Sequence, residues 1–128
     1  MDLHKLSLGR QLEGLKKGDF TSTELTSHYL NRISELDSQL NSFITVTEDQ
    51  ALSQAKAADD RYRTNNNFPL DGLPIAHKDI FCTKGVLTTC GSKMLSNFEA
   101  PYSSTVYDKL DKQGMVMLGK TNMDEFAM

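Results

Sequence analysis

The sequence GLPIAHKD, residues 72–79, predicts a buried strand over residues 73–78, because an apolar run stands between a turn and a charged end. Its proline lies near the beginning of the strand, where a missing backbone N–H is tolerated. A second apolar run, residues 115–118, predicts another strand, and a polar turn follows it at residues 119–122. Helix signals precede both strands, and helix followed by strand, repeated, is typical of crossover units around a sheet. The sequence therefore predicts the α/β fold class.

The residues before the first of these strands carry two helix signals. Leucines at helical spacing predict a helix over residues 3–17, which Gly18 ends. Thr21 and Glu24 predict a capping box at the start of the second helix, because their side chains can each accept a bond from an otherwise unpaired backbone N–H. We expect the apolar face of this second helix to pack on the core.

Three further elements have readable signals. β-branched and aromatic residues predict a short strand at residues 43–46. Residues 47–50 predict a second capping box, which opens an alanine-rich helix that ends near residue 62. Ser103 or Ser104 is predicted to cap the last helix.

Length and composition restrict the class of protein. A chain of 128 residues forms at most one domain, and its 38% hydrophobic and 24% charged residues exclude a disordered tail. A formal net charge of −3 is too balanced for a protein that grips nucleic acid backbones. No apolar run approaches the ~20 residues of a membrane span, and the start lacks the apolar segment of a signal peptide. We therefore expect a cytoplasmic protein without membrane contact, in which Cys82 and Cys90 are reduced thiols.

Lys78 is the main candidate for chemistry. It ends the strand predicted at residues 73–78 and stands beside Asp79, at the edge where α/β sheets place their sites. A lysine taken out of water favours its neutral form, and a neutral amine can act as a base. The alternative is a lysine at a strand end whose ammonium reaches solvent. The local sequence alone favours this second interpretation.

His77 is the neighbouring candidate for a base. Successive side chains of an extended strand alternate, so His77 shares a face with the apolar residues of the strand and Lys78 points the other way. We therefore interpret His77 as a structural histidine. A metal site formed by His77, Cys82 and Cys90 would have a spacing that matches no standard zinc pattern.

Two other segments imitate catalytic motifs. Residues 114–121 formally match the phosphate-binding loop Gly-x-x-x-x-Gly-Lys-Thr. Such a loop needs flexible backbone N–H groups between a strand and a helix, whereas residues 115–118 are predicted to be a strand, so we interpret the match as accidental. Ser92 lacks the Gly-x-Ser-x-Gly elbow of a nucleophile, and we expect it in a loop or a helix cap.

Several of these segments together resemble the opening blocks of the amidase signature family. They are GLPIAHKD at residues 72–79, CTKG at residues 82–85 and TTCGS at residues 88–92. GKTNMDEFAM at residues 119–128 resembles the tRNA-dependent amidotransferase members of the family in particular. The similarity covers almost the whole chain and is most specific from residue 71 onward.

The resemblance implies an α/β/α sandwich with a mixed central sheet, of which this chain is the N-terminal portion. We accordingly expect residues 1–128 to form one incomplete domain. Its mainly helical part extends over about residues 1–64, and the start of the sheet, with the strand of the catalytic lysine, extends over about residues 71–128.

The resemblance also implies a Ser–cis-Ser–Lys amide hydrolase. Lys78 matches the family's lysine, which acts as a base through a bridging serine on the nucleophilic serine. That nucleophile releases ammonia from glutamine through an acyl-enzyme. Both serines lie on a Gly/Ser-rich loop beyond Met128, so we expect this chain alone to be inactive, and Met128 itself is expected to contribute to substrate binding.

The implied partners are the other subunits, B and C, of the amidotransferase. The ammonia passes to a partner subunit, which uses ATP and Mg to activate glutamate on mischarged tRNA. Neither a metal nor a cofactor is expected in this segment.

The sequence departs from the family at two positions. His77 stands where many relatives carry an apolar or small residue, and Ser103 stands where many carry aspartate, although either residue can cap a helix. Two other functions stay open: an amide hydrolase that acts without a partner, and a non-catalytic binding module.

Overall fold

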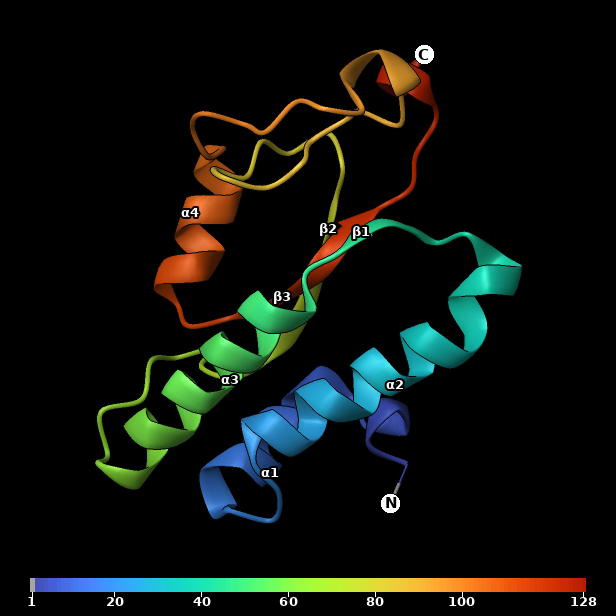
Figure 1. Cartoon of the computed structure of the whole chain (residues 1–128). Helices are drawn as coiled ribbons and strands as arrows, with labels where there is room; N and C mark the ends of the chain where they lie inside the picture. The colour runs from blue at the N-terminus through green and yellow to red at the C-terminus, as the bar shows by residue number, and fades with distance from the viewer. Residues whose placement is uncertain (1) are drawn as a thin grey trace.

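The computed structural model describes residues 2–128, which form helices around a small sheet (Figure 1). The α-helices are α1 (Leu8–Lys17), α2 (Ser22–Leu40), α3 (Glu48–Arg63) and α4 (Thr105–Lys112). The strands are β1 (Phe43–Val46), β2 (Pro74–Lys78) and β3 (Val116–Thr121). Short 3₁₀ turns are η1 (Leu3–Lys5), η2 (Lys93–Leu95) and η3 (Glu125–Ala127).

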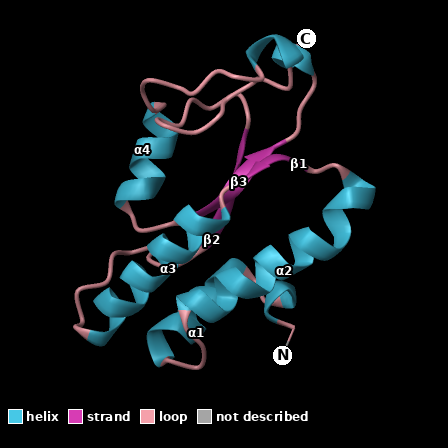
Figure 2. Ribbon diagram, in the orientation of Figure 1, coloured by secondary structure: helices cyan, strands magenta, loops and turns pink. Residues whose placement is uncertain are grey.

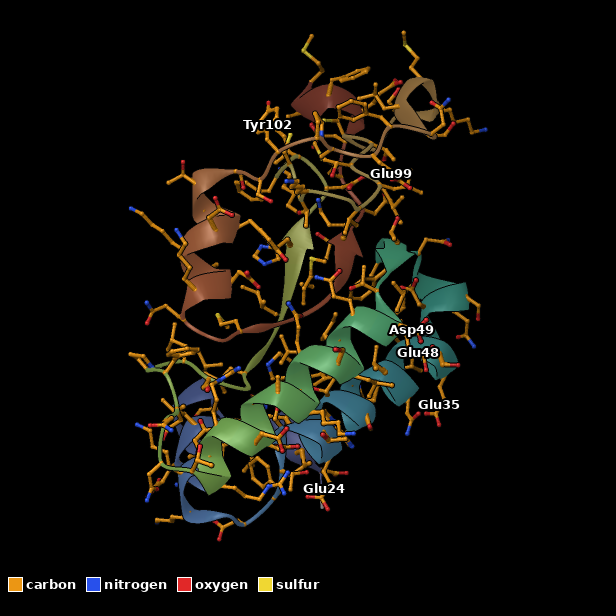
Figure 3. The ribbon with its side chains drawn as sticks, turned by 60° about the vertical axis from the view of Figure 1, so that its left-hand side comes forward. Glu24, Glu35, Glu48, Asp49, Glu99 and Tyr102 are labelled. Carbon is orange, nitrogen blue, oxygen red and sulfur yellow. The ribbon has the colours of Figure 1, made fainter. Side chains whose placement is uncertain are left out.

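β3 is the central strand of a mixed sheet with the order β1-β3-β2. It runs antiparallel to β1 and parallel to β2, and Lys78 at the end of β2 pairs with Thr121 at the end of β3. The carboxyl ends of the two parallel strands therefore meet at one edge, where Figure 3 shows both arrowheads. The predicted α/β class is confirmed.

Helices cover both faces of this sheet (Figures 1 and 2). α2 and α3 lie on one face, where small alanines let α3 approach β3 closely. α4 lies on the other face, where the ring of Tyr107 meets the ring of His77 edge-on at 5.1 Å. The sheet is thus the middle of three layers, as a sandwich requires.

Two apolar clusters form the core. The first joins α1 and α2 to the segments that enter the two parallel strands, and its buried members are Leu3, Leu15, Phe20, Leu25, Leu73 and Met115. The second lies between α2, α3 and β3, and its buried members are Leu30, Ala51, Ala55, Val116 and Leu118. Both clusters combine residues of the predicted helical part with residues of the predicted sheet part.

The register of the parallel pair shifts by one residue in the middle of the sheet. Ile75 pairs with Met117, but Ala76 pairs with Gly119, so Leu118 is an extra residue in β3. A shift of one residue moves the following side chains to the face opposite to the one that unbroken alternation would give them. The shift decides where the polar end of β3 points.

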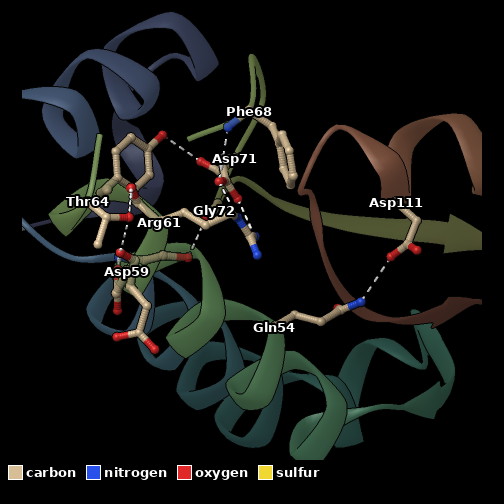
Figure 4. A network of polar contacts seen from close by, with 11 residues as sticks. Gln54, Asp59, Arg61, Thr64, Phe68, Asp71, Gly72 and Asp111 are labelled. Atoms are coloured by element: carbon tan, nitrogen blue, oxygen red, sulfur yellow. Dashed lines mark hydrogen bonds and ion pairs between the residues drawn. The ribbon is translucent and has the colours of Figure 1, made fainter. Parts of the chain in front are cut away.

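A buried ion pair fixes the amino end of β2 (Figure 4). Asp71 is fully buried, and its two carboxylate oxygens accept bonds from Nε and Nη2 of Arg61, both at 2.6 Å. Oδ2 also accepts the N–H of Phe68 at 3.1 Å, and the Asp71 carbonyl accepts the Tyr62 hydroxyl at 2.7 Å. The Arg61 side chain is 28% exposed and lies over the Phe68 ring at 4.9 Å. Every polar atom of the Asp71 side chain is thus satisfied.

The prediction of one helix over residues 3–17 is wrong at its start. The backbone is extended at Ser7, whose hydroxyl accepts the N–H of Arg10 and thereby caps α1, so the preceding residues form the separate turn η1. The predicted end at Gly18 is confirmed, with a left-handed φ of 77°. The capping box of Thr21 and Glu24 is also confirmed.

The second predicted capping box is wrong, although the helix is present. The Thr47 hydroxyl donates to the Met117 carbonyl at 2.8 Å, and no side chain caps the start of α3. The neighbouring strand therefore competes successfully for this hydroxyl. At α4 the structure selects Ser104 as the cap, while the Ser103 hydroxyl accepts the N–H of Lys84 at 2.9 Å.

Candidate active site at the carboxyl ends of β2 and β3

Lys78 is the last residue of β2, and its side chain is exposed. His77 beside it is only 5% exposed, so the two neighbours point to opposite sides, as the alternation predicts. Within residues 2–128 the Lys78 ammonium is therefore in contact with water. Residues 2–128 do not supply the desolvation that a lysine base requires.

Asp79 follows Lys78 and points into the molecule. Its carboxylate is fully buried, and Oδ2 accepts the N–H and the hydroxyl of Thr89 at 2.9 and 2.5 Å. Its backbone N–H donates to the Thr121 carbonyl at 3.1 Å, and its carbonyl accepts the N–H of Cys90 at 3.2 Å. Asp79 thereby ties the end of β2 to the end of β3 and to the loop beyond them.

Lys120 is the buried cation opposite Asp79. The residue is 0% exposed, and its Nζ lies 3.7 Å from Asp79 Oδ1. The same ammonium donates to the Phe81 carbonyl at 2.5 Å and to the hydroxyl oxygens of Thr83 and Thr88 at 3.1 and 3.3 Å. Within the described residues Asp79 Oδ1 accepts no hydrogen bond. The ammonium thus has three acceptors, whereas this carboxylate oxygen relies on attraction across 3.7 Å.

Burial and charge both act on the protonation of this edge. Burial lowers the pKa of Lys120, and the negative charge of Asp79 partly offsets that effect. Burial also lowers the pKa of His77, and the positive charge of Lys120 lowers it further. His77 is therefore neutral at neutral pH and packs against Tyr107, which supports its structural role.

The last residues of the chain return to the loop beyond this edge, which Figure 3 marks with Glu99 and Tyr102. The N–H of Phe126 donates to the Cys90 carbonyl at 2.9 Å. The Ser92 hydroxyl donates to Glu125 Oε1 at 2.6 Å and also caps η2, so the expected cap role of Ser92 is confirmed. Met128 is 96% exposed, and its expected contact with substrate stays a prediction.

The phosphate-loop match is accidental, as predicted. Val116–Thr121 is the strand β3, and its lysine is enclosed rather than free to meet a phosphate. The turn predicted at residues 119–122 is therefore wrong, because residues 119–121 pair with both neighbouring strands. Cys82 and Cys90 are free thiols, as predicted. Across residues 2–128, no group of three or more His, Cys, Asp or Glu side chains could hold a metal ion. In the same residues, no helix has the length and apolar character needed to cross a membrane.

Comparisons with known proteins agree with this arrangement of strands. The family model described as Amidase matches residues 24–128. This chain belongs to the amidase family. The predicted resemblance to that family is therefore confirmed.

Two relatives are similar over almost the whole of this chain. The A subunit of glutamyl-tRNA(Gln) amidotransferase from Alcanivorax borkumensis is 60% identical over 98% of the chain, and its counterpart from Pseudomonas entomophila is 61% identical over 98%. The chain spans only 27% and 26% of the length of these relatives. The native peptide amidase of Stenotrophomonas maltophilia matches in structure with a TM-score of 0.89 at 32% identity, over 95% of this chain and 26% of that one.

Sequence reasoning misses the interaction of Lys120 with Asp79. It places Lys120 in a polar turn and in an accidental phosphate loop, and Asp79 only beside Lys78. One sequence feature could have indicated that Lys120 has a partner: it follows directly on an apolar strand segment. A lysine in such a segment has to be either exposed to solvent or paired with an opposite charge. Its partner could not be found this way, because the register shift at Leu118 decides which face Lys120 occupies.

Proposed function

We propose that this chain is the N-terminal part of the glutamine-hydrolysing subunit of a tRNA-dependent amidotransferase. The observation that carries the proposal is the close similarity to the glutamyl-tRNA(Gln) amidotransferase relatives, which includes the strand that presents Lys78. In a protein of the relatives' length, about three quarters of the chain is available to cover Lys78 and take it out of water.

We further propose that Lys78 is the base of a Ser–cis-Ser–Lys triad whose serines lie outside residues 1–128. Neutral Lys78 accepts a proton from the bridging serine, which accepts the proton of the nucleophilic serine. The serine oxygen bonds to the amide carbon of glutamine, the C–N bond breaks, and ammonia leaves with the transferred proton. Water then cleaves the acyl-enzyme ester and releases glutamate. Met128 is proposed to contact the substrate.

The proposed partners supply the second half of the reaction. The other subunits, B and C, of the amidotransferase receive the ammonia, and the partner subunit uses ATP and Mg to activate glutamate on mischarged tRNA. This segment itself is proposed to bind no cofactor. The proposed cellular location is the cytoplasm.

The substitution Lys78→Arg tests the role of Lys78 in the reconstituted complex of full-length subunits. Arginine keeps the positive charge and a similar reach but does not deprotonate in proteins. Glutamine-dependent amidation should fall by on the order of 10²–10⁴-fold, which corresponds to roughly 3–5 kcal/mol of lost transition-state stabilisation. Amidation with ammonia supplied directly should not change, because the partner's chemistry does not need this amine.

Lys84→Arg is the matched control, because Lys84 is an exposed lysine of the loop that follows β2. It should leave both amidation rates near the wild-type values. Near-normal glutamine-dependent turnover of the Lys78→Arg variant would mean that Lys78 is a solvent-exposed strand-end lysine and not the base. Loss of both the glutamine-dependent and the ammonia-dependent rate would point to damaged assembly instead.

A further inference from the structure

Lys120 and Asp79 form a buried pair that is incompletely satisfied. Both side chains are 0% exposed, and the ammonium lies 3.7 Å from Oδ1, beyond the length of a hydrogen bond. Oδ1 has no other partner within residues 2–128. A buried charge without its full set of bonds is costly, and such groups are retained where they serve a purpose other than stability.

The position of the pair indicates that purpose. Asp79 is covalently next to Lys78, and the two side chains leave the backbone on opposite sides, one inward and one toward solvent. Four contacts hold Asp79 in place: two bonds from Thr89, one backbone bond to β3 and one from Cys90. The orientation of the Lys78 side chain therefore depends on how Asp79 is anchored.

We propose that Lys120 is a positioning residue for the reaction at Lys78, acting through Asp79. Lys120 neutralises the carboxylate that anchors the end of β2 and, through Phe81, Thr83 and Thr88, holds the loop that follows it. It cannot itself meet a substrate, because the whole residue is enclosed. The inference rests on the proposed function, since it requires Lys78 to be the base.

The charged and titratable groups around Lys120 determine how removal of its positive charge affects the protonation of Lys78. The groups that face it are Asp79 from the segment after β2, His77 from β2, and the thiols of Cys82 and Cys90. Asp79 is the one carboxylate among them. Without Lys120 the negative charge of Asp79 has no compensating cation one residue from Lys78. An uncompensated negative charge favours the protonated, inactive form of Lys78.

The experiment measures glutamine-dependent and ammonia-dependent amidation by the reconstituted full-length complex across pH. Lys120→Met should lower the glutamine-dependent kcat by on the order of 10–100-fold per folded molecule, because misplacement by about 1 Å is enough for such a loss. KM for glutamine and the ammonia-dependent rate should not change. The acidic limb of the glutamine-dependent pH profile should move to higher pH.

The double variant Lys120→Met with Asp79→Asn makes the test specific for charge. Removal of the second charge should return the acidic limb toward its wild-type position, while kcat stays low because the anchor is lost. A merely structural role predicts no movement of the limb in either variant. If Lys120→Met fails to fold, Asp79→Asn alone keeps the shape of the side chain and the oxygen that Thr89 contacts, and should still lower kcat without changing KM.

Two further variants separate the possible failures. Asp71→Asn makes the same chemical change in the buried pair at the other end of β2, and should leave kcat per folded molecule and the pH profile unchanged. Lys78→Ala in the same assay tests the proposed function: if it keeps its glutamine-dependent turnover, Lys78 is not the base. If Lys78→Ala is inactive but Lys120→Met has normal kcat and an unmoved limb, the positioning role is overturned and the proposed function stands.

Discussion

The two ends of β2 each carry a buried ion pair, and the pairs are built differently. At the amino end, Asp71 forms two bonds of 2.6 Å with Arg61, and its remaining polar atoms are also paired (Figure 4). At the carboxyl end, Asp79 is separated from Lys120 by 3.7 Å and keeps one oxygen without a hydrogen bond among the described residues. In the first pair both carboxylate oxygens are hydrogen-bonded, whereas in the second pair one of them is not.

The difference follows from where chemistry can occur in a parallel sheet. Ligands of α/β proteins bind beyond the carboxyl ends of the strands, so side chains at the amino ends are free to be selected for stability alone. Arg61 also keeps part of its charge in contact with solvent, because its side chain is 28% exposed. Lys120 has no contact with solvent, so the burial of its charge costs free energy.

The largest effect on stability is expected when the pair at the amino end is broken. Asp71→Ala removes both bonds to Arg61 and leaves the N–H of Phe68 unpaired, which should cost about 3 kcal/mol of local unfolding free energy. Hydrogen exchange of the β2 amides in the full-length subunit should accelerate accordingly. Asp60→Ala, which breaks the exposed pair with Arg63, should cost less than about 1 kcal/mol. Equal effects of the two substitutions would show that burial does not strengthen the Asp71 pair.

A smaller effect is expected at Gly114, which packs against the same carboxylate. A Cβ built there would lie 2.3 Å from Asp71 Oδ1, and the φ of 86° is unfavourable for any residue with a side chain. Gly114→Ala should therefore cost about 2–3 kcal/mol, measured by hydrogen exchange of β2 and β3. Gly85→Ala is the matched control, because Gly85 has a φ of 76° but no atom within 4 Å of the added Cβ. Gly85→Ala should cost about 1 kcal/mol. If Gly114→Ala costs no more than Gly85→Ala, the contact with Asp71 does not contribute to the loss of stability.

These two expectations rest on contacts that only the structure reveals, although many helix ends and strands can be predicted from the sequence. The capping box at Thr21, the end at Gly18 and the presence of three strands are local features, so sequence reasoning finds them, although it ends the third strand at residue 118 instead of Thr121. The place of Lys78 at the strand end is readable locally, whereas its role as a base is implied by the family resemblance alone and stays a prediction.

The remaining features depend on tertiary contacts. The Thr47 hydroxyl bonds to Met117, which is distant in the sequence, so its failure to cap α3 could not be predicted. The pairing of Lys120 with Asp79 depends on the extra residue Leu118 in β3, because unbroken alternation gives Lys120 the opposite face. A register shift leaves no signal in residue periodicity alone.

The smallest expected effect is an acid dependence of stability at the carboxyl end of β2. The pKa of His77 in the folded state is lowered, first by burial and then by Lys120, below its ordinary value of 6.5. The unfolded state therefore binds the proton first as the pH falls, and stability is lost from about pH 6.5 downward through the folded-state pKa. The exchange of β2 amides, compared at about pH 7.5 and about pH 5.5 after correction for intrinsic rates, should show this loss. In His77→Gln the loss should be smaller, and an unchanged pH dependence would mean that His77 is not its source.

In our proposal, the carboxyl end of β2 serves the reaction and its amino end serves stability. The most direct test of this division measures glutamine-dependent turnover per folded molecule for Lys78→Ala and Asp71→Ala side by side in the reconstituted complex, together with hydrogen exchange of β2. We expect Lys78→Ala to lose at least about 10²-fold in turnover with unchanged exchange, because Lys78 is exposed in this segment. We expect Asp71→Ala to accelerate exchange with unchanged turnover per folded molecule. A loss of turnover in Asp71→Ala as large as that in Lys78→Ala would contradict the division.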